Sequence, residues 1–296
     1  MLHIVSTACL RQAARPVTAE MKEIFMKKSA IFLLALCIAS VICCGCSKAG
    51  GDADDEKSTP AVVVGSDEYE PFNYVDENGD FAGIDVELAQ EAFGRMGYRP
   101  VFKNIVWEDK NRYLNDEEVD CLWGSFTMTD REGEYEWAGP YMYSRQIVVV
   151  HADSDIYELA DLEGKRVAVQ ATSKPESVFL NTADARIPHI GALYSFSTMD
   201  EIYSCLRKRY ADAIAGHEGA LSSFMKTSPG TYRILDESLY TSELGVAFKN
   251  GRHSSMSARL TEILDDMKRD GTTERIIKKY GLDSDYALKG QAGADD

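Results

Sequence analysis

The sequence lacks the short motifs that mark the common enzyme classes. It contains no Gly-x-Ser-x-Gly nucleophile motif, no His-Glu-x-x-His zinc motif, no phosphate-binding loop and no dinucleotide-binding glycine pattern. Its 5 histidines show none of the spacings that are typical of metal ligands. We therefore expect a protein without catalytic residues, metal or cofactor.

Basic residues are few. The chain has 32 Lys and Arg against 48 Asp and Glu, a net charge of -16 at pH 7. Such an acidic protein repels nucleic acid and anionic lipid, so neither is expected as a partner. The sequence also has no short repeat, no coiled-coil pattern and no second long apolar run after the N-terminal one. The length that remains for folding fits one large or two modest domains.

The N-terminal apolar run extends from Ala30 to Cys44, after the basic stretch Met26-Lys27-Lys28 and before Gly45. The run is shorter than the ~20 residues that a membrane-spanning helix needs. A basic start, an apolar stretch and a small residue in this order are typical of an export signal. We interpret residues 1–45 as an upstream extension followed by a lipoprotein signal peptide.

Cysteine is concentrated at the end of this run, where Cys43-Cys44-Gly45-Cys46 resembles a bacterial lipobox. The resemblance implies that Cys46 is acylated and becomes the mature N-terminus, which would anchor the protein to the outer face of the cell membrane, outside the cytoplasm. Cys43 departs from the pattern, which has Leu, Val or Ile there, so an ordinary cleavable signal is the alternative. Residues 46–60 are polar and contain glycines, which predicts a flexible tether.

From residue 61 onward, predicted strands and helices alternate. The apolar stretch Ala61–Val64 indicates a buried strand, and Asn78-Gly79 indicates the tip of a hairpin. The spacing of apolar residues from Val86 to Met96 predicts a helix, with Asp85 as its cap and Gly97 after its end. The alternation favours a mostly parallel sheet with helices on both faces.

The alternating strands and helices are predicted to form two successive series along residues 61–283. A long extended segment, residues 142–152, separates two series of elements, and a second one, residues 243–251, returns before two closing helices at about 255–269 and 272–280. Two α/β lobes joined by two extended crossings imply a hinge. A ligand site between the lobes is typical of such folds.

Several segments of the body stand in a characteristic order: "VGSDEYEPFNY", "NGDFAGIDVELA", "VDCLWGS", "TDREGEYEWAGPY", "DLEGKRVAVQATS", "RYADAIAGHE" and "KKYG". In this order, over residues 61–283, they resemble the extracellular solute-binding proteins of ABC transporters, in particular the amino-acid-binding family. The resemblance implies an α/β fold of the periplasmic-binding-protein-like type II, with two α/β lobes joined by two hinge strands.

The resemblance also implies a division of the chain. Lobe 1 is expected at 61–146 and 241–284, lobe 2 at 147–240, and a disordered tail at 285–296. Cys121 then falls in lobe 1 and Cys205 on a helix of lobe 2. Because a disulfide needs α-carbons within ~7 Å, both cysteines are expected to be free thiols.

Arg131 stands among acidic residues at positions 130, 132, 134 and 136. One interpretation is a surface salt bridge, which would contribute little to stability. The other is an unpaired guanidinium that binds a carboxylate from solution. The resemblance implies the second, because the family's carboxylate-gripping Arg stands six residues before an aromatic, as Arg131 does before Trp137. Counting from Thr127 gives Glu132 instead, but only a cation suits this role.

The resemblance extends to other positions. Ser173 matches a hydroxyl at a helix start that makes the second carboxylate contact, and it also begins a capping box with Glu176. His217 stands where the family has the Asp that meets the ligand's ammonium group; we favour Glu218 for this role, and a ligand without an ammonium group is the alternative. The other expected ligand-binding residues are Tyr69, Trp107, Gly124, Ser125, Thr127 and Gln170. For the two aromatics, a place in the core is the alternative.

These residues predict a monomeric, membrane-tethered substrate-binding subunit of an ABC importer. It would hold an amino acid or similar small zwitterion between two closing lobes and deliver it to a permease in the membrane. One alternative is an enzyme on the same scaffold, such as a cyclohexadienyl or arogenate dehydratase or a peptidoglycan-cleaving enzyme, with Glu218 as general acid. Another is the ligand-sensing module of a signalling system, although the sequence shows no C-terminal spanning helix or kinase region.

Overall fold

The fold is a mixed α/β structure. The computed structural model describes residues 59–181 and 184–290 of the 296-residue chain. The strands are β1 (Ala61–Ser66), β2 (Tyr74–Val75), β3 (Phe81–Ala82), β4 (Arg99–Asn104), β5 (Cys121–Leu122), β6 (Glu136–His151), β7 (Arg166–Gln170), β8 (Ala192–Phe196), β9 (Ala213–His217), β10 (Tyr232–Ile234) and β11 (Tyr240–Phe248). The α-helices are α2 (Ile84–Arg95), α3 (Lys110–Asn115), α4 (Lys174–Leu180), α5 (Met199–Arg207), α6 (Glu218–Lys226), α7 (Ser254–Arg269), α8 (Thr272–Lys279) and α9 (Ser284–Lys289). None of these helices is long and apolar enough to cross a membrane.

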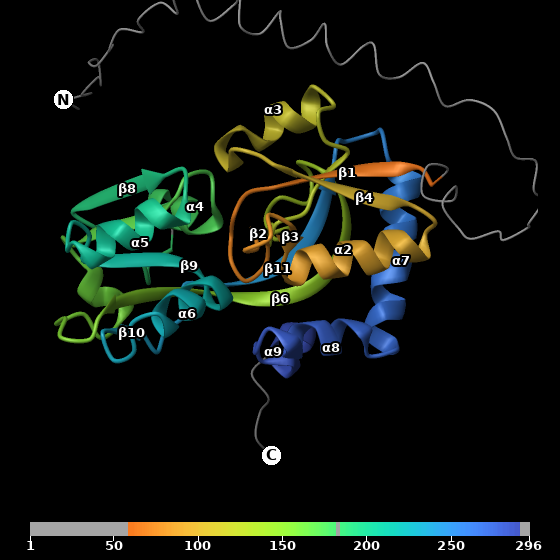
Figure 1. Ribbon diagram of the computed structural model, residues 1–296. Helices are drawn as coiled ribbons and strands as arrows, with labels where there is room; N and C mark the ends of the chain where they lie inside the picture. The colour runs from red at the N-terminus through yellow and green to blue at the C-terminus, as the bar shows by residue number, and fades with distance from the viewer. Residues whose placement is uncertain (1–58, 182–183, 291–296) are drawn as a thin grey trace, which may run out of the picture. The chain divides into compact units, whose positions relative to one another are not determined.

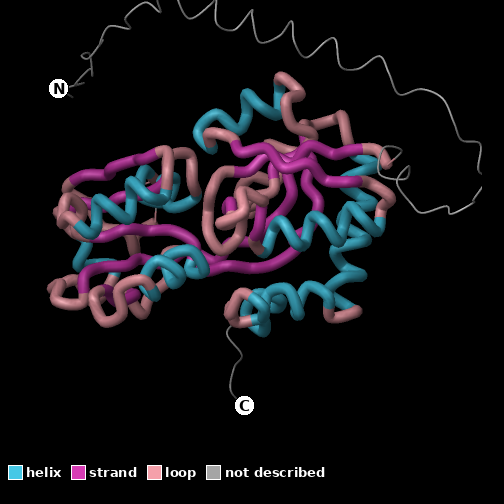
Figure 2. Tube along the Cα trace, in the orientation of Figure 1, coloured by secondary structure: helices cyan, strands magenta, loops and turns pink. Residues whose placement is uncertain are grey.

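Two groups of parallel strands lie on either side of two long antiparallel strands (Figures 1 and 2). The strand order is β4-β1-β5-β11-β6-β9-β7-β8, with β10 also paired to β6. We refer to the half that contains β1, β4 and β5 as lobe 1 and to the half that contains β7, β8 and β9 as lobe 2. Strands β2 and β3 form a separate hairpin, as the turn at Asn78-Gly79 predicted.

Strand β6 runs through both halves of the sheet, and β11 pairs with β5 of lobe 1 and with β6. From Glu136 to Gln146, β6 pairs with β11, and from Gln146 to Val150 it pairs with β9 of lobe 2. Gln146 is therefore the residue at which β6 changes its partner. This arrangement agrees with two expected crossings, while the limits of the lobes at 146/147 and 240/241 stay a prediction.

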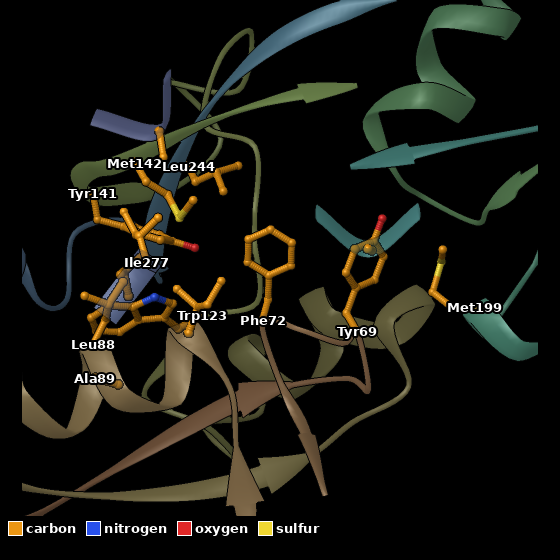
Figure 3. Packing of buried hydrophobic residues seen from close by; sticks show 14 of the residues in the cluster. Tyr69, Phe72, Leu88, Ala89, Trp123, Tyr141, Met142, Met199, Leu244 and Ile277 are labelled. Atoms are coloured by element: carbon orange, nitrogen blue, oxygen red, sulfur yellow. The ribbon is translucent and has the colours of Figure 1, made fainter. Parts of the chain in front are cut away.

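The core of lobe 1 forms where the predicted helical stripe meets the sheet. Leu88, Ala89 and Phe93 of α2 are fully buried, and the Phe93 ring lies 5.9 Å from the ring of Trp123. Figure 3 shows Leu88 and Ala89 beside Trp123 and Tyr141. Burying apolar surface stabilises a fold by roughly 25 cal/mol per Å². The same core cluster continues into lobe 2, where Met199 lies near Tyr69 (Figure 3).

Two local predictions need correction. Asp85 does not cap α2, because Gly83 occupies the cap position and the buried Asp85 carboxylate accepts a hydrogen bond from the Ser125 N–H at 2.6 Å. Residues 285–289 are not a disordered tail but belong to α9, in which Tyr286 and Ala287 are buried. Asp283 begins this helix by accepting from two backbone N–H groups, which supplies the cap that a six-residue helix needs.

Cys121 and Cys205 are both free and both buried, which confirms the expectation of two thiols. The predicted signal peptide, the lipobox with Cys46 and most of the tether lie outside the described residues.

Candidate functional site

A cavity lies between the lobes, next to the ends of strands β7 and β9. It is lined from lobe 1 and the crossing strands by Tyr69, Trp107, Gly124, Ser125, Phe126, Thr127, Arg131 and Gln146, and from lobe 2 by Gln170, Thr172, Ser173, Lys174, Pro175, Ala215, Gly216 and His217. Nine of the ten expected ligand-binding residues are in this set, which lacks only Glu218. A position at the carboxyl ends of parallel strands is where open α/β sheets bind ligands.

Arg131 lies on the lobe 1 wall of the cavity. Its Nη1 donates to the Thr127 carbonyl at 3.2 Å, and its Nη2 lies 3.5 Å from the Thr172 carbonyl of lobe 2. The guanidinium also stacks over the Phe126 ring, 5.3 Å from its centroid. Among the residues that the structure describes, no carboxylate forms an ion pair with Arg131. Its neighbour Asp130 instead accepts from Lys174 at 2.5 Å.

The surroundings of Arg131 keep its charge available. Burial lowers the pKa of the guanidinium from its ordinary value, yet arginine stays protonated in proteins. The surface salt bridge, one of the two interpretations of Arg131, is therefore not formed within residues 59–181 and 184–290. The guanidinium keeps donor capacity toward the cavity.

Lys110 is a second cation at this site that sequence reasoning missed. Its Nζ donates to the Thr172 hydroxyl at 2.6 Å and lies 5.1 Å from the Trp107 ring centroid. The side chain is only 5% exposed. Burial, and then the charge of Arg131, lower the pKa of Lys110 to about 8. Nothing in the sequence distinguishes this lysine from the solvent-facing ones on other helices.

Lobe 2 contributes the start of helix α4. Ser173 is its N-cap, and the Ser173 hydroxyl accepts from the Glu176 N–H at 3.4 Å. The Glu176 carboxylate accepts from the N–H of Thr172 at 2.6 Å, so the predicted capping box closes one residue earlier than expected. Thr172 has a left-handed backbone with φ of 57°, and its oxygen atoms lie beside both cations of lobe 1.

Gln170 links the lobes at the edge of the cavity. Its Nε2 donates to the Asp67 carboxylate of lobe 1 at 2.5 Å. Burial raises the pKa of Asp67 to about 6, although the hydrogen bond from Gln170 opposes this shift. Asp67 lines a neighbouring pocket rather than this cavity. Sequence reasoning did not assign a role to Asp67.

The aromatic walls are buried, and each has contacts within the protein. Tyr69 and Trp107 are each 5% exposed. The Tyr69 hydroxyl accepts from the His217 N–H at 3.2 Å, and the Trp107 ring meets Phe126 edge-on with centroids 5.0 Å apart. Both rings therefore belong to the core and to the cavity lining at the same time, so the two interpretations of these aromatics coexist.

The segment from Gly124 to Thr127 is shaped by close contacts. A side chain at Gly124 would place its Cβ 2.2 Å from the Ser66 hydroxyl oxygen, so the Ser66 side chain would have to move. Ser125 has a left-handed backbone with φ of 43°. The Thr127 hydroxyl donates to Ser242 at 3.1 Å.

His217 and Glu218 are adjacent in sequence but face different surroundings. The His217 ring is buried, with Nδ1 3.0 Å from the Ser144 hydroxyl oxygen. Burial lowers the pKa of His217 to about 3, so the imidazole is neutral. The Glu218 carboxylate instead accepts from Arg145 at 2.7 and 2.5 Å and lines another pocket. The junction of β9 and α6 turns these consecutive side chains apart, so the structure does not bring Glu218 to the cavity.

Gln146 also lines the cavity and was not expected there. It is 1% exposed, and its Nε2 lies 3.0 Å from the Ser242 hydroxyl oxygen and 3.0 Å from Nε2 of His217. Its Oε1 is buried and has no hydrogen-bond partner within the described part of the chain. Gln146 stands where β6 changes its pairing partner, and this position can be recognised only once the strand pairing is known.

The fold and the site together define a two-lobed binding protein whose cavity presents a cation between the lobes. Residues 62–283 match the family of bacterial extracellular solute-binding proteins, family 3, and the chain belongs to that family. This result confirms the resemblance and the fold class expected from the sequence.

Individual relatives share the fold over most of the chain. The L-cystine-binding protein TcyA of Bacillus subtilis is 28% identical over 269 residues, which cover 86% of this chain and 97% of that protein. An ancestral arginine-binding protein solved with arginine is 27% identical, covers 75% of this chain and 98% of its own, and superposes with a TM-score of 0.68. An ancestral amino acid-binding protein described as a precursor of cyclohexadienyl dehydratase is 24% identical, with a TM-score of 0.67 over 77% of this chain and 99% of its own, and shows the same fold.

Proposed function

We propose that this protein is the substrate-binding subunit of an ABC importer and that it closes its two lobes around one small solute of the amino-acid class. The observation that carries the proposal is the position of Arg131. This cation lines a cavity between two lobes and has no carboxylate partner among the described residues. A bound carboxylate would supply the missing partner.

The cavity offers several groups to such a carboxylate. The planar guanidinium of Arg131 can bind both carboxylate oxygens at once. Lys110 adds positive charge beside it, and its contact with Thr172 brings that charge to the start of α4. The Ser173 hydroxyl at this helix start can donate a further hydrogen bond to an anion. Because Arg131 and Lys110 belong to lobe 1 and Ser173 belongs to lobe 2, a carboxylate held by all three would draw the lobes together.

The proposal includes a membrane anchor and a permease partner. Acylation of Cys46 would hold the folded body at the outer face of the membrane through a tether at 46–60. Stable anchoring needs two signals or more than one acyl chain, since each buried methylene contributes ~0.8 kcal/mol. The subunit would act as a monomer and pass its solute to the permease.

An enzyme on the same scaffold is the alternative function. It would need a general acid in the cavity. Glu218, the residue considered for this role, faces Arg145 in another pocket. No Asp or Glu lines the cavity within the described ranges. These two observations favour binding without chemistry, and incubation with prephenate or arogenate, followed by product analysis, tests the alternative directly.

A thermal-shift screen of the purified protein tests the proposed function. The screen covers the twenty amino acids, small carboxylates and short peptides. A ligand at 100 times its Kd stabilises the folded protein by ~2.7 kcal/mol, which corresponds to a rise in Tm of roughly 5 to 10 °C for a domain of this size. We expect at least one carboxylate to produce such a rise and the Arg131→Ala variant to show none. If no carboxylate raises the Tm, the proposed function is wrong.

A further inference from the structure

Both cations of lobe 1 reach the same residue of lobe 2, Thr172. The Nζ of Lys110 donates to the Thr172 hydroxyl at 2.6 Å and lies 3.5 Å from its carbonyl oxygen. Nη2 of Arg131 lies 3.5 Å from the same carbonyl oxygen. Thr172 and Arg131 line the cavity, whereas Lys110 is not among the lining residues within the described ranges. The contact of Lys110 therefore joins one lobe directly to the other.

Lobe 1 holds the ammonium group of Lys110 beside two aromatic rings. Nζ lies 5.1 Å from the ring centroid of Trp107 and 5.7 Å from that of Phe126. The residue is only 5% exposed. Burial lowers its pKa to about 8, so the side chain is still cationic at pH 7. A buried ammonium group needs hydrogen-bond acceptors, and Thr172 supplies them from the other lobe.

Lobe 2 presents Thr172 in a fixed orientation. Its backbone is left-handed, with φ of 57°, which is unfavourable for a β-branched residue. The Glu176 carboxylate accepts from the Thr172 N–H at 2.6 Å and also accepts from the Ser195 hydroxyl of β8. A strained backbone persists only where its surroundings hold it in place. The groups of Thr172 that receive Lys110 are therefore oriented by lobe 2 itself.

A second polar contact between the lobes lies in a more exposed place. Lys174 of lobe 2 donates to Asp130 of lobe 1 at 2.5 Å, and the Asp130 side chain is 66% exposed. Exposed ion pairs contribute little to stability, because water and salt screen them. The contact of Lys110 with Thr172 is buried, and its loss would leave an ammonium group without these acceptors. The buried contact is therefore the stronger of the two.

We infer that Lys110 and Thr172 form a latch that stabilises the closed lobes by direct contact and not through the solute. The apparent affinity for a solute depends on how much of the protein is in the closed form, so the latch strengthens binding. Because the Thr172 hydroxyl is occupied by Lys110, the latch strengthens binding of every solute by the same factor. Selectivity is left to the residues that contact the solute. This inference rests on the proposed function, because it assumes that the lobes close around a solute.

Calorimetry of the purified protein with each of the twenty L-amino acids tests the latch. Thr172→Val keeps the branched shape of threonine and removes only the hydroxyl. For every amino acid that binds the wild type, we expect its Kd to rise at least about tenfold, by factors that agree within about threefold. Thr172→Ser keeps the hydroxyl and should bind within about threefold of the wild type. Asp130→Asn, which removes the exposed ion pair, should also stay within about threefold.

A double-mutant cycle shows whether the two residues act together. Lys110→Met removes the ammonium group from a side chain of similar length, and it should also raise the Kd at least about tenfold. In the Lys110→Met background, Thr172→Val should change the Kd by less than about twofold, because the latch is already lost. This comparison needs only one amino acid that binds.

Several outcomes would overturn the latch. One is a rise of less than about tenfold in Thr172→Val, and another is an additive effect of the two substitutions. Losses that differ by more than about threefold among the amino acids would place the Thr172 hydroxyl on the solute instead. If thermal unfolding shows that Thr172→Val does not fold, Lys110→Met decides alone, and a rise of less than about tenfold overturns the latch.

Failure of the proposed function looks different. In that case no amino acid binds the wild type, or Arg131→Ala binds as the wild type does, and the latch falls with the proposed function. Failure of the latch alone leaves binding to the wild type and its dependence on Arg131 intact.

Discussion

Replacing Arg131 by alanine should abolish solute binding while leaving the protein folded. Each charge-assisted hydrogen bond contributes about 1.5 to 3 kcal/mol, so a guanidinium that makes two bonds to one carboxylate contributes about 3 to 6 kcal/mol. The Kd should therefore rise roughly 100-fold to 20,000-fold. Folding should suffer little, because within the described residues the guanidinium donates only to two backbone carbonyls, at 3.2 and 3.5 Å.

Arg145 provides a matched control in the same protein. Its guanidinium also lies over an aromatic ring, that of Tyr286 at 5.0 Å, but it is paired with Glu218 and lines a different pocket. Calorimetry on Arg131→Ala, Arg145→Ala and the wild type, with the carboxylate found by the thermal-shift screen, measures the affinities. Thermal unfolding without ligand measures the stabilities.

The two variants should separate clearly. We expect Arg131→Ala to lose binding with a change in Tm of no more than a few degrees, and Arg145→Ala to bind within about threefold of the wild type. Unchanged affinity of Arg131→Ala would refute the reasoning, because the guanidinium would then have no carboxylate to hold. Equal losses in the two variants would also refute it, since the effect would not be specific to the cavity.

Four further predictions concern three other residues. The pKa of Lys110 is lowered to about 8 in the folded protein. Between pH 8 and the ordinary pKa of lysine, the unfolded chain therefore binds more protons than the folded one, so stability should rise with pH in this window. Thermal unfolding should show a larger rise for the wild type than for Lys110→Met. The same lysine is cationic only below about pH 8, so affinity for a carboxylate that does not itself titrate should fall as pH rises through 8, and Lys110→Met should flatten this dependence in calorimetry. Cys46→Ala should release the protein from the cell membrane, measured by fractionation and by mass spectrometry of the N-terminus; a wild-type protein without lipid would contradict it. Glu218→Gln should leave the ligand preference intact, because this carboxylate faces Arg145; a changed preference would place Glu218 at the site after all.

Local patterns in the sequence predicted the elements that depend on near neighbours. The apolar stripe of α2 predicted its buried face because residues three and four apart lie on one side of a helix. The hairpin tip at Asn78-Gly79 followed from turn chemistry, and the two crossings followed from long extended segments between alternating elements. Arg131 was singled out not by a local pattern but by the family resemblance, which implies a carboxylate-binding Arg six residues before an aromatic, a role that suits only a cation.

The remaining parts of the site depend on contacts between distant residues. Lys110 is buried, and its Nζ donates to the hydroxyl group of Thr172, 62 positions later in the chain. Gln146 reaches the cavity because β6 exchanges its partner there. Glu218 was favoured by a shift of one residue, but at a junction of strand and helix one residue is enough to turn a side chain to another face.

The most direct measurement of the central claim is calorimetry with a bound carboxylate and its carboxamide, which have nearly the same shape and differ in charge. If Arg131 holds the solute, the purified protein should bind one carboxylate per chain, and the carboxamide should bind at least about 100-fold more weakly. Binding of the carboxamide as tightly as the carboxylate would contradict the account.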